Sequence, residues 1–319
     1  MNKHLHIVSF DIPYPPSYGG VIDVFFKIKA LHAAGVQVHL HCFEYGRARA
    51  KELNDICASV NYYPRKKGAR FLFSESPYIV ATRSSEEMMK NIMAVDAPVL
   101  FEGLHCCYHL GDARLKGRKK IVRMHNIEHD YYFGLANVER SFFKRWYFKR
   151  EAVKLERFEN ILSQADHVIA ISPADANALS SRYKHVTNII AFHPDECVQV
   201  RQGSGRFALY HGNLAIGENN EAALYLVREI FNGINIPLVI AGNNPSQELL
   251  AAAKQNANVA VKSNIPTASI YELIRDAQIN ILPTFQATGI KLKLLAALFN
   301  GRHCIVNSPM VANTGLEQL

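Results

Sequence analysis

The sequence of 319 residues lacks the features of a membrane-spanning, fibrous or disordered chain. No apolar run approaches the ~18 residues of a membrane span, and the sequence holds neither internal repeats nor low-complexity tracts. Asp11 and Pro13 interrupt the apolar stretch at the N-terminus, so we expect no signal peptide. With 49% apolar and 20% charged residues, the composition is that of a globular protein long enough for two domains.

Motifs that would assign a function directly are also absent. There is no G-x-G-x-x-G and no Walker motif, which argues against a dinucleotide dehydrogenase and a P-loop enzyme. None of the 6 cysteines stands in a C-x-x-C pair, which favours reduced thiols and a cytoplasmic protein. The formal net charge of +8 suits anionic partners such as phosphates, nucleotides or lipid headgroups. It is too dispersed to indicate nucleic acid.

Short β-branched runs alternate with helix-like stretches, and this series begins twice along the chain. Such alternation indicates βαβ units with a mainly parallel sheet. We therefore predict an α/β protein of two Rossmann-like domains, at 1–185 and 206–319, joined by a linker at 186–205, with parallel sheets that face each other across a cleft. The expected strands are 4–10, 36–43, 98–101, 120–124 and 167–171, then 207–211, 237–241, 259–261, 279–282 and 304–307; the expected helices include 21–34, 218–231, 245–254, 267–277 and 290–299.

In open α/β sheets, ligands bind in the loops that follow the carboxyl ends of the strands. Gly19 and Gly20 follow the first strand and open a helix, where close backbone approach and a helix N-terminus suit a phosphate. A tight turn is an equally good interpretation of this pair. His125 directly follows the strand at 120–124. It can act on a ligand by a hydrogen bond or by electrostatics, or it can be purely structural.

The segment 125–129 also matches H-x-x-E-H, a zinc hydrolase pattern formed here by His125, Glu128 and His129. That chemistry needs both histidines on one face of a helix. Because His125 comes directly off a strand, we favour a single poised histidine and expect no metal.

The second half has two candidate loops. Gly212 and Asn213 follow its first strand, and Asn219 lies at the start of the next helix. These asparagines can donate hydrogen bonds to phosphate or sugar oxygens, or they can cap the helix.

The segment from Thr288 and Gly289 opens an apolar helix that carries Lys291 and Lys293 in its first turns. Because the helix macrodipole disfavours cations there, two lysines indicate a bound anion. Successive residues turn by about 100°, so we expect only one lysine to face the ligand. Two solvated lysines are the alternative.

A basic aromatic helix is expected at 139–157. Such a helix can lie on an anionic membrane surface, which would place a cytoplasmic protein at the inner face of the membrane. Alternatively, its aromatic residues dock it onto its own sheet.

Taken in order, these segments resemble the retaining nucleotide-sugar glycosyltransferases of the B-type, double Rossmann fold, and in particular family 4 with its mannosyltransferase relatives from bacterial polysaccharide loci. The resemblance extends over essentially the whole chain. The matching marks are Gly19-Gly20, His125-Asn126, the run 165–172 (ADHVIAIS), Tyr210-His211-Gly212-Asn213 and the run 293–301 (KLLAALFNG).

The resemblance implies a function and a set of roles. The enzyme would move a sugar from a nucleotide diphosphate to a glycan or lipid-linked acceptor, with retention, without a metal and with no cofactor besides the donor. Gly19 and Gly20 would line the donor or acceptor side of the cleft and bind the donor, and His125 would contact the transferred sugar near the reaction centre as the catalytic residue. The Gly212 loop, with Asn213 and Asn219, and the Thr288-Gly289 loop would hold the diphosphate. Lys293, and with it Lys291, would supply positive charge.

The chain departs from the family pattern at several positions. Asn213 and Asn219 occupy the places of an arginine and a lysine that grip the diphosphate in many members. Thr288 (or Gln286) and Ala296 replace two glutamates. These departures motivate an alternative, a glycosyltransferase-like protein that binds a nucleotide or glycan without turnover. Members usually continue beyond the place where this chain ends, so we also expect the C-terminal domain to be truncated.

Overall fold

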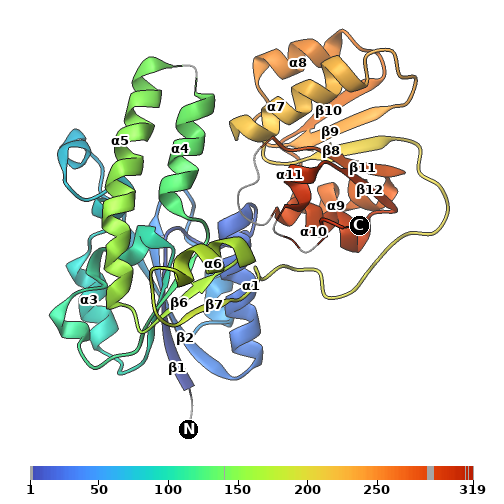
Figure 1. The fold of residues 1–319 in the computed structure, drawn as a ribbon. Helices are drawn as coiled ribbons and strands as arrows, with labels where there is room; N and C mark the ends of the chain where they lie inside the picture. Colours follow the sequence, from blue (N-terminus) through green and yellow to red (C-terminus); the bar gives the residue numbers. More distant parts are fainter. Residues whose placement is uncertain (1–2, 140, 286–290, 313, 315, 319) are drawn as a thin grey trace. The chain divides into compact units, whose positions relative to one another are not determined.

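The computed structural model describes residues 3–139, 141–285, 291–312, 314 and 316–318. The chain forms two compact units, Met1–His193 and Pro194–Leu319 (Figure 1). The division falls inside the linker predicted at 186–205. Each unit is built around its own parallel sheet.

The first unit contains a sheet of seven strands in the order β3-β2-β1-β4-β5-β6-β7, paired in parallel throughout. Because the strands run the same way, the loops that follow them lie along one edge of the sheet. Its elements are β1 (Lys3–Ser9), α1 (Gly19–Ala33), β2 (Val36–Glu44), β3 (Ser59–Pro64), α2 (Tyr78–Ala81), α3 (Glu86–Met93), β4 (Val99–Glu102), β5 (Lys120–Met124), α4 (Glu128–Val138), α5 (Phe142–Phe158), β6 (His167–Ala170), α6 (Pro173–Ser180) and β7 (Val186–Asn188).

Side chains alternate between the two faces of this sheet, as the pleat requires. On β1, Ile7 faces a core that includes Val24 and Ile28 of α1. Its neighbour Val8 belongs to the opposite core, to which α3 contributes Met88. The sheet is thus a middle layer with helices on both sides.

The second unit contains a sheet of five parallel strands in the order β10-β9-β8-β11-β12. It too has a core on each face, one around Tyr210 and Leu294 and the other around Leu209 and Ile274. Its elements are β8 (Ala208–His211), α7 (Gly217–Tyr225), which continues as a π-helical turn (Leu226–Ile230), β9 (Leu238–Gly242), α8 (Gln247–Lys254), β10 (Val259–Ser263), α9 (Thr267–Asp276), β11 (Ile279–Leu282), α10 (Leu292–Asn300), β12 (His303–Val306) and α11 (Ser308–Val311).

The predicted architecture of two parallel-sheet α/β units is confirmed. Two edge strands were missed. β3 is half-polar, and β7 has 3 residues inside the predicted linker, so neither shows a clear period in the sequence. The helix predicted to start at 139 begins at Phe142, because Ser141 is still extended. Among the helices of the described residues, none combines the length and the apolarity that a membrane span requires.

Four histidines lie side by side on β1 and β2, which pair in register. The rings of His6 and His41 are 5.2 Å apart and both are buried. His6 donates through Nε2 to the carbonyl of Val95, so its Nδ1 must accept from Nε2 of His41 at 3.0 Å. His41 Nδ1 then accepts from the Tyr63 hydroxyl at 2.8 Å. The chain of bonds has donors and acceptors in the right places only while both rings are neutral.

This arrangement predicts acid sensitivity. Burial lowers the pKa of His6 to about 4 and that of His41 to about 3. Protons are therefore taken up on unfolding below about pH 6.5, and stability falls as the pH drops, by up to about 1.4 kcal/mol per pH unit for each histidine. Urea titrations followed by circular dichroism between pH 7 and 5 measure this slope. The His41→Gln variant is expected to show a shallower slope, whereas His32→Gln, at an exposed position, keeps that of the wild type. An unchanged slope in His41→Gln contradicts the assignment.

Candidate active site

His125 is held at the carboxyl edge of the first sheet, directly after β5. The ring of Phe10, which follows β1, packs edge-on against it with centroids 5.6 Å apart. Gly20 opens α1 against the same phenylalanine, since a Cβ at this position would lie 2.5 Å from Phe10 Cζ. The structure thus brings both Gly20 and His125 against the ring of Phe10. Gly19 stands beside them at the first position of α1.

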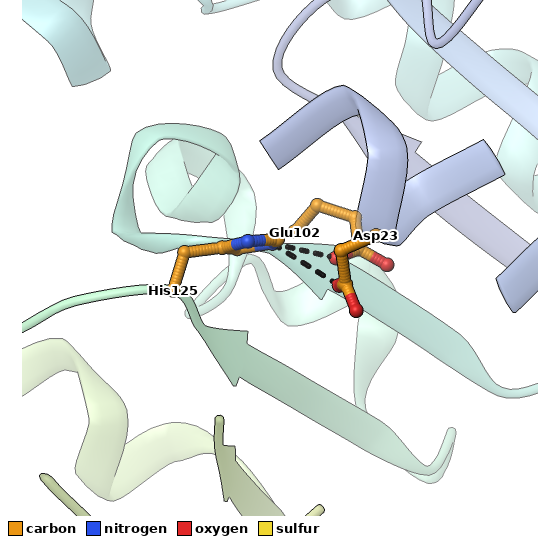
Figure 2. A group of neighbouring side chains, drawn as sticks. All are labelled: Asp23, Glu102 and His125. Carbon is orange, nitrogen blue, oxygen red and sulfur yellow. Dashed lines mark hydrogen bonds and ion pairs between the residues drawn. The ribbon is translucent and has the colours of Figure 1, made fainter. Parts of the chain in front are cut away.

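Two carboxylates meet the imidazole from neighbouring elements (Figure 2). His125 Nε2 lies 3.0 Å from Glu102 Oε2 at the end of β4 and 3.9 Å from Asp23 Oδ2 on α1. Lys27, one helical turn after Asp23, bridges both acids, with its Nζ 3.1 Å from Asp23 and 2.6 Å from Glu102. Because Nε2 is committed to Glu102, Nδ1 is the ring atom left for a ligand.

Arg123 of β5 completes this buried cluster. Its Nε and Nη2 each donate to Asp23 at 2.8 Å, the two-pronged geometry that suits guanidinium and carboxylate. Arg123 also donates to the carbonyls of Ile189 and Ile190, and Asp23 accepts from the backbone N–H of Phe192 at 2.7 Å. The cluster that holds the imidazole therefore also holds the last segment of the first unit.

The charges of the cluster balance without the imidazole. Burial by itself would raise the pKa values of Asp23 and Glu102. Lys27 and His125 outweigh it at both carboxyls, together with Arg123 at Asp23, and hold both pKa values below their ordinary range. Two carboxylates thus face the two cations Lys27 and Arg123. Asp23, Glu102 and His125 are the one group within the described residues that has metal-site geometry. A divalent cation there would lie against Lys27 and Arg123, which disfavours it.

The three residues of the zinc hypothesis do not come together. His129 Nδ1 lies 3.1 Å from Glu159 Oε2, whereas His125 Nε2 lies 3.0 Å from Glu102 Oε2. Glu128 is buried at the start of α4, where its Oε1 is 3.7 Å from Nδ1 of His105. Burial raises the pKa of Glu128 to about 8, so at neutral pH it is mostly a neutral acid.

In the second unit, the loop after β8 gathers three of the predicted residues. Asn219 Nδ2 donates to the carbonyl of Asn213 at 3.0 Å. The side chain of Asn219 also covers Gly212, where a Cβ would lie 3.3 Å from Asn219 Cγ. At Gly242, a Cβ would lie 1.9 Å from the Gly212 carbonyl oxygen, so β9 admits only glycine beside this loop.

Lys293 in α10 and Lys291, the extended residue just before that helix, have different surroundings. Lys293 is largely buried, and its Nζ donates to Asn219 Oδ1 at 2.8 Å and to the Tyr210 hydroxyl at 3.3 Å. Burial lowers the pKa of Lys293 to about 8. Lys291 pairs instead with Glu218 at 2.9 Å, and Glu218 also accepts from the Thr284 hydroxyl. Lys293 is therefore the cation that joins the Gly212 loop. Thr288 and Gly289 lie outside the described residues.

Sequence reasoning missed five charged residues of these sites. In the first unit these are Asp23, Lys27, Glu102 and Arg123, and in the second Glu218. The signal that could have found the first four is a charge inside an otherwise apolar strand or helix face, as in the run 120–124 (KIVRM).

The chain is similar to known proteins in both sequence and structure. Residues 24–191, more than half of the chain, match the family described as "Glycosyltransferase Family 4". The chain belongs to this family. The match begins within α1 and covers β4 and β5, and with them Lys27, Glu102, Arg123 and His125 of the cluster. The protein is therefore a glycosyltransferase.

Relatives and solved structures agree with this assignment. An "uncharacterized 44.6 kDa protein in cps region" of Klebsiella pneumoniae is 28% identical over 327 residues, with 97% of this chain and 84% of the relative covered. The crystal structure of TarM is similar with a TM-score of 0.65 at 10% identity, covering 96% of this chain and 85% of TarM. The lipopolysaccharide outer core galactosyltransferase WaaB gives 0.58 at 14% identity, covering 95% and 80%. At such identities the two structures establish the fold alone, which is the B-type glycosyltransferase fold.

The family 4 enzyme should lose much of its stability when Asp23 is changed. In Asp23→Asn, Arg123 and Lys27 lose a charged partner in a buried position, which costs about 3–5 kcal/mol. The midpoint of urea unfolding, followed by circular dichroism, is expected to fall accordingly. Asp55→Asn, at an exposed position, serves as the control and should stay within about 0.5 kcal/mol of the wild type. Equal midpoints for the two variants would refute a stabilising role for the cluster.

Proposed function

We propose that this glycosyltransferase moves a hexose from a nucleotide diphosphate sugar to a glycan or lipid-linked acceptor in bacterial polysaccharide synthesis. Mannose is the sugar that the likeness to mannosyltransferases favours. The description of the Klebsiella relative as a protein in a cps region supports the polysaccharide context.

The observation that carries the proposal is the position of Lys293. Lys293 is the second residue of α10, and its ammonium lies beside the Gly212 loop. Among the described residues its hydrogen-bond partners are the neutral side chains of Tyr210 and Asn219. A diphosphate at this point would meet a buried cation and the N-terminus of a helix, which together stabilise a leaving anion without a metal. Asn213 and Asn219 would add amide hydrogen bonds to the same loop.

His125 would serve the sugar in this scheme. With Nε2 bound to Glu102, Nδ1 is free to accept a hydrogen bond from a sugar hydroxyl. In a retaining transfer, the bond between the anomeric carbon and the diphosphate breaks, and a bond to the acceptor oxygen forms on the same face. The proton of the acceptor hydroxyl passes to the departing diphosphate. Gly19 and Gly20, which open α1 next to Phe10, would line the donor or acceptor side of this site.

Nucleotide binding provides the first test. Calorimetric titration with UDP, GDP, ADP and CMP, with and without magnesium, is expected to give saturable binding of one nucleotide that is indifferent to magnesium. In Lys293→Ala, the Kd should rise tenfold or more, because a charged hydrogen bond is worth about 1.5–3 kcal/mol. Lys262→Ala, at an exposed position on β10, is the matched control. Since the pKa of Lys293 is about 8, wild-type affinity should be level below pH 8 and weaken above it. Binding that is unchanged in Lys293→Ala removes this residue from the site.

Turnover distinguishes the enzyme from a non-catalytic binding protein, the alternative that the missing carboxylates favour. With the nucleotide identified by calorimetry, release of the free nucleoside diphosphate from its sugar conjugates is measured for wild type and His125→Ala. We expect His125→Ala to lower kcat at least a hundredfold with little change in nucleotide Kd, because His125 lies outside the nucleotide-holding unit. Rates that are equal and at background in both proteins would establish the non-catalytic alternative.

A further inference from the structure

Two short segments of the first unit are rich in cations and lack acids. The segments 65–73 (RKKGARFLF) and 142–150 (FFKRWYFKR) contain no acidic residue. Their basic residues are Arg65, Lys66, Lys67, Arg70, Lys144, Arg145, Lys149 and Arg150. These eight cations lie within a chain whose formal net charge is +8.

The two segments form one surface. Lys154 of α5 donates to the carbonyl of Leu72 at 2.9 Å, which fastens the first segment to the helix. The guanidinium of Arg150 lies 5.9 Å from the ring centre of Phe73 and 5.4 Å from that of Trp146, and so bridges one segment to the other. Figure 1 shows the first segment beside α5.

Large apolar side chains project from this surface. Phe142, Phe143 and Trp146 are 68%, 80% and 55% exposed, and Phe73 is 74% exposed. At about 100° per residue, Phe142, Trp146 and Arg150 lie on one side of α5. The opposite side packs inward through Glu151 and Leu155, which are buried. The aromatic rings are therefore not what fastens α5 to its own sheet.

The cations of this surface are also free of carboxylates. Within the part of the chain that the structure describes, none of the eight takes part in an ion pair; Arg65 and Lys66 instead bond the hydroxyls of Thr82 and Ser84. Basic side chains usually find acidic neighbours on a mixed surface. Here exposed rings and unpaired cations alternate, the pattern of a helix that lies in the interface of an anionic bilayer.

We propose that this surface, formed by residues 65–73 and the outward side of α5 at 142–150, docks onto a bilayer that contains anionic phospholipids. The cations would meet the headgroups while Phe142, Phe143 and Trp146 enter the boundary with the acyl chains. A nucleic acid duplex would satisfy the cations but leave the neighbouring apolar rings in water, and a second copy of the chain would repel the same positive charge. The bilayer is the partner that uses both features. This inference needs no turnover and does not depend on the proposed reaction.

The chain carries its own probe, because Trp146 is its single tryptophan. Full-length protein is mixed with vesicles of phosphatidylcholine alone or with added phosphatidylglycerol. With anionic vesicles we expect co-sedimentation, a blue shift of Trp146 emission and quenching by brominated acyl chains. Binding should weaken as salt is raised. With phosphatidylcholine alone we expect neither binding nor a shift.

Two variants and a matched control isolate the surface. Lys144→Gln/Arg145→Gln/Lys149→Gln should lower the partition coefficient at least tenfold while keeping the tryptophan. Phe142→Ser/Phe143→Ser should abolish the blue shift. The control Lys51→Gln/Lys90→Gln/Lys119→Gln removes the same charge from exposed positions elsewhere in the first unit and should bind as the wild type.

Three outcomes would overturn the proposal. They are no binding of wild type to anionic vesicles, an equal loss in the control, and binding without a shift of Trp146. Tight binding of an oligonucleotide that survives Phe142→Ser/Phe143→Ser would assign the surface to nucleic acid instead. Calorimetric titration of the same variants with nucleotide measures nucleotide binding independently of vesicle binding. A failure of the membrane proposal can therefore be distinguished from a failure of the proposed function.

Discussion

The first unit depends on one buried ion pair, Asp23 with Arg123. A carboxylate out of water is costly, and it is stable here because every lone pair is used: twice by Arg123, once by Lys27 and once by the N–H of Phe192. These bonds tie α1, β5 and the end of the unit to one point. The imidazole of His125 is joined to the same cluster by its hydrogen bond with Glu102. Its orientation is therefore set by the core of the sheet rather than by a loop, which is what a group that must meet a reacting sugar requires.

The second unit differs from the first in how its buried charge is paired. Lys291 has its carboxylate in Glu218, but the more deeply placed Lys293 has only the neutral oxygens of Asn219 and Tyr210. Burial outweighs the favourable field of the Glu218 carboxylate and lowers the pKa of Lys293 to about 8. The first unit thus holds a cluster whose charges balance, and the second holds a buried cation that an anion would stabilise. This difference fits the proposed roles, in which the first group positions a sugar and the second receives a diphosphate.

A sequence pattern records local periodicity and residue type, and this determines which parts of the fold and of the candidate sites could be predicted. Strands such as β5 and β11 were located to the residue because buried parallel strands are short apolar runs between turns. His125 was found because it follows such a strand. The partners Asp23 and Glu102 were not, because they lie about 100 and 20 residues earlier and only the fold brings them to the imidazole. The contact of Lys293 with Asn219 spans 74 residues, and no local period signals it. Single charges in apolar elements were the available clue.

The departures from the family pattern gain a physical interpretation from that last contact. Asn219 stands where many members have a lysine that grips the diphosphate, and its side-chain oxygen accepts from Lys293 Nζ at 2.8 Å. The ammonium of Lys293 is therefore hydrogen-bonded to the side chain that stands in place of that lysine. The positive charge at this point thus comes from Lys293 of α10 rather than from a residue at the start of α7. Asn213, in the place of the arginine, uses its Oδ1 to accept from the N–H of Ala215 and shapes the loop instead. Because one cation stands in place of two, we expect a lower affinity for the diphosphate. Loss of Lys293 should therefore reduce donor affinity by a larger factor than loss of one cation from a site that also has an arginine.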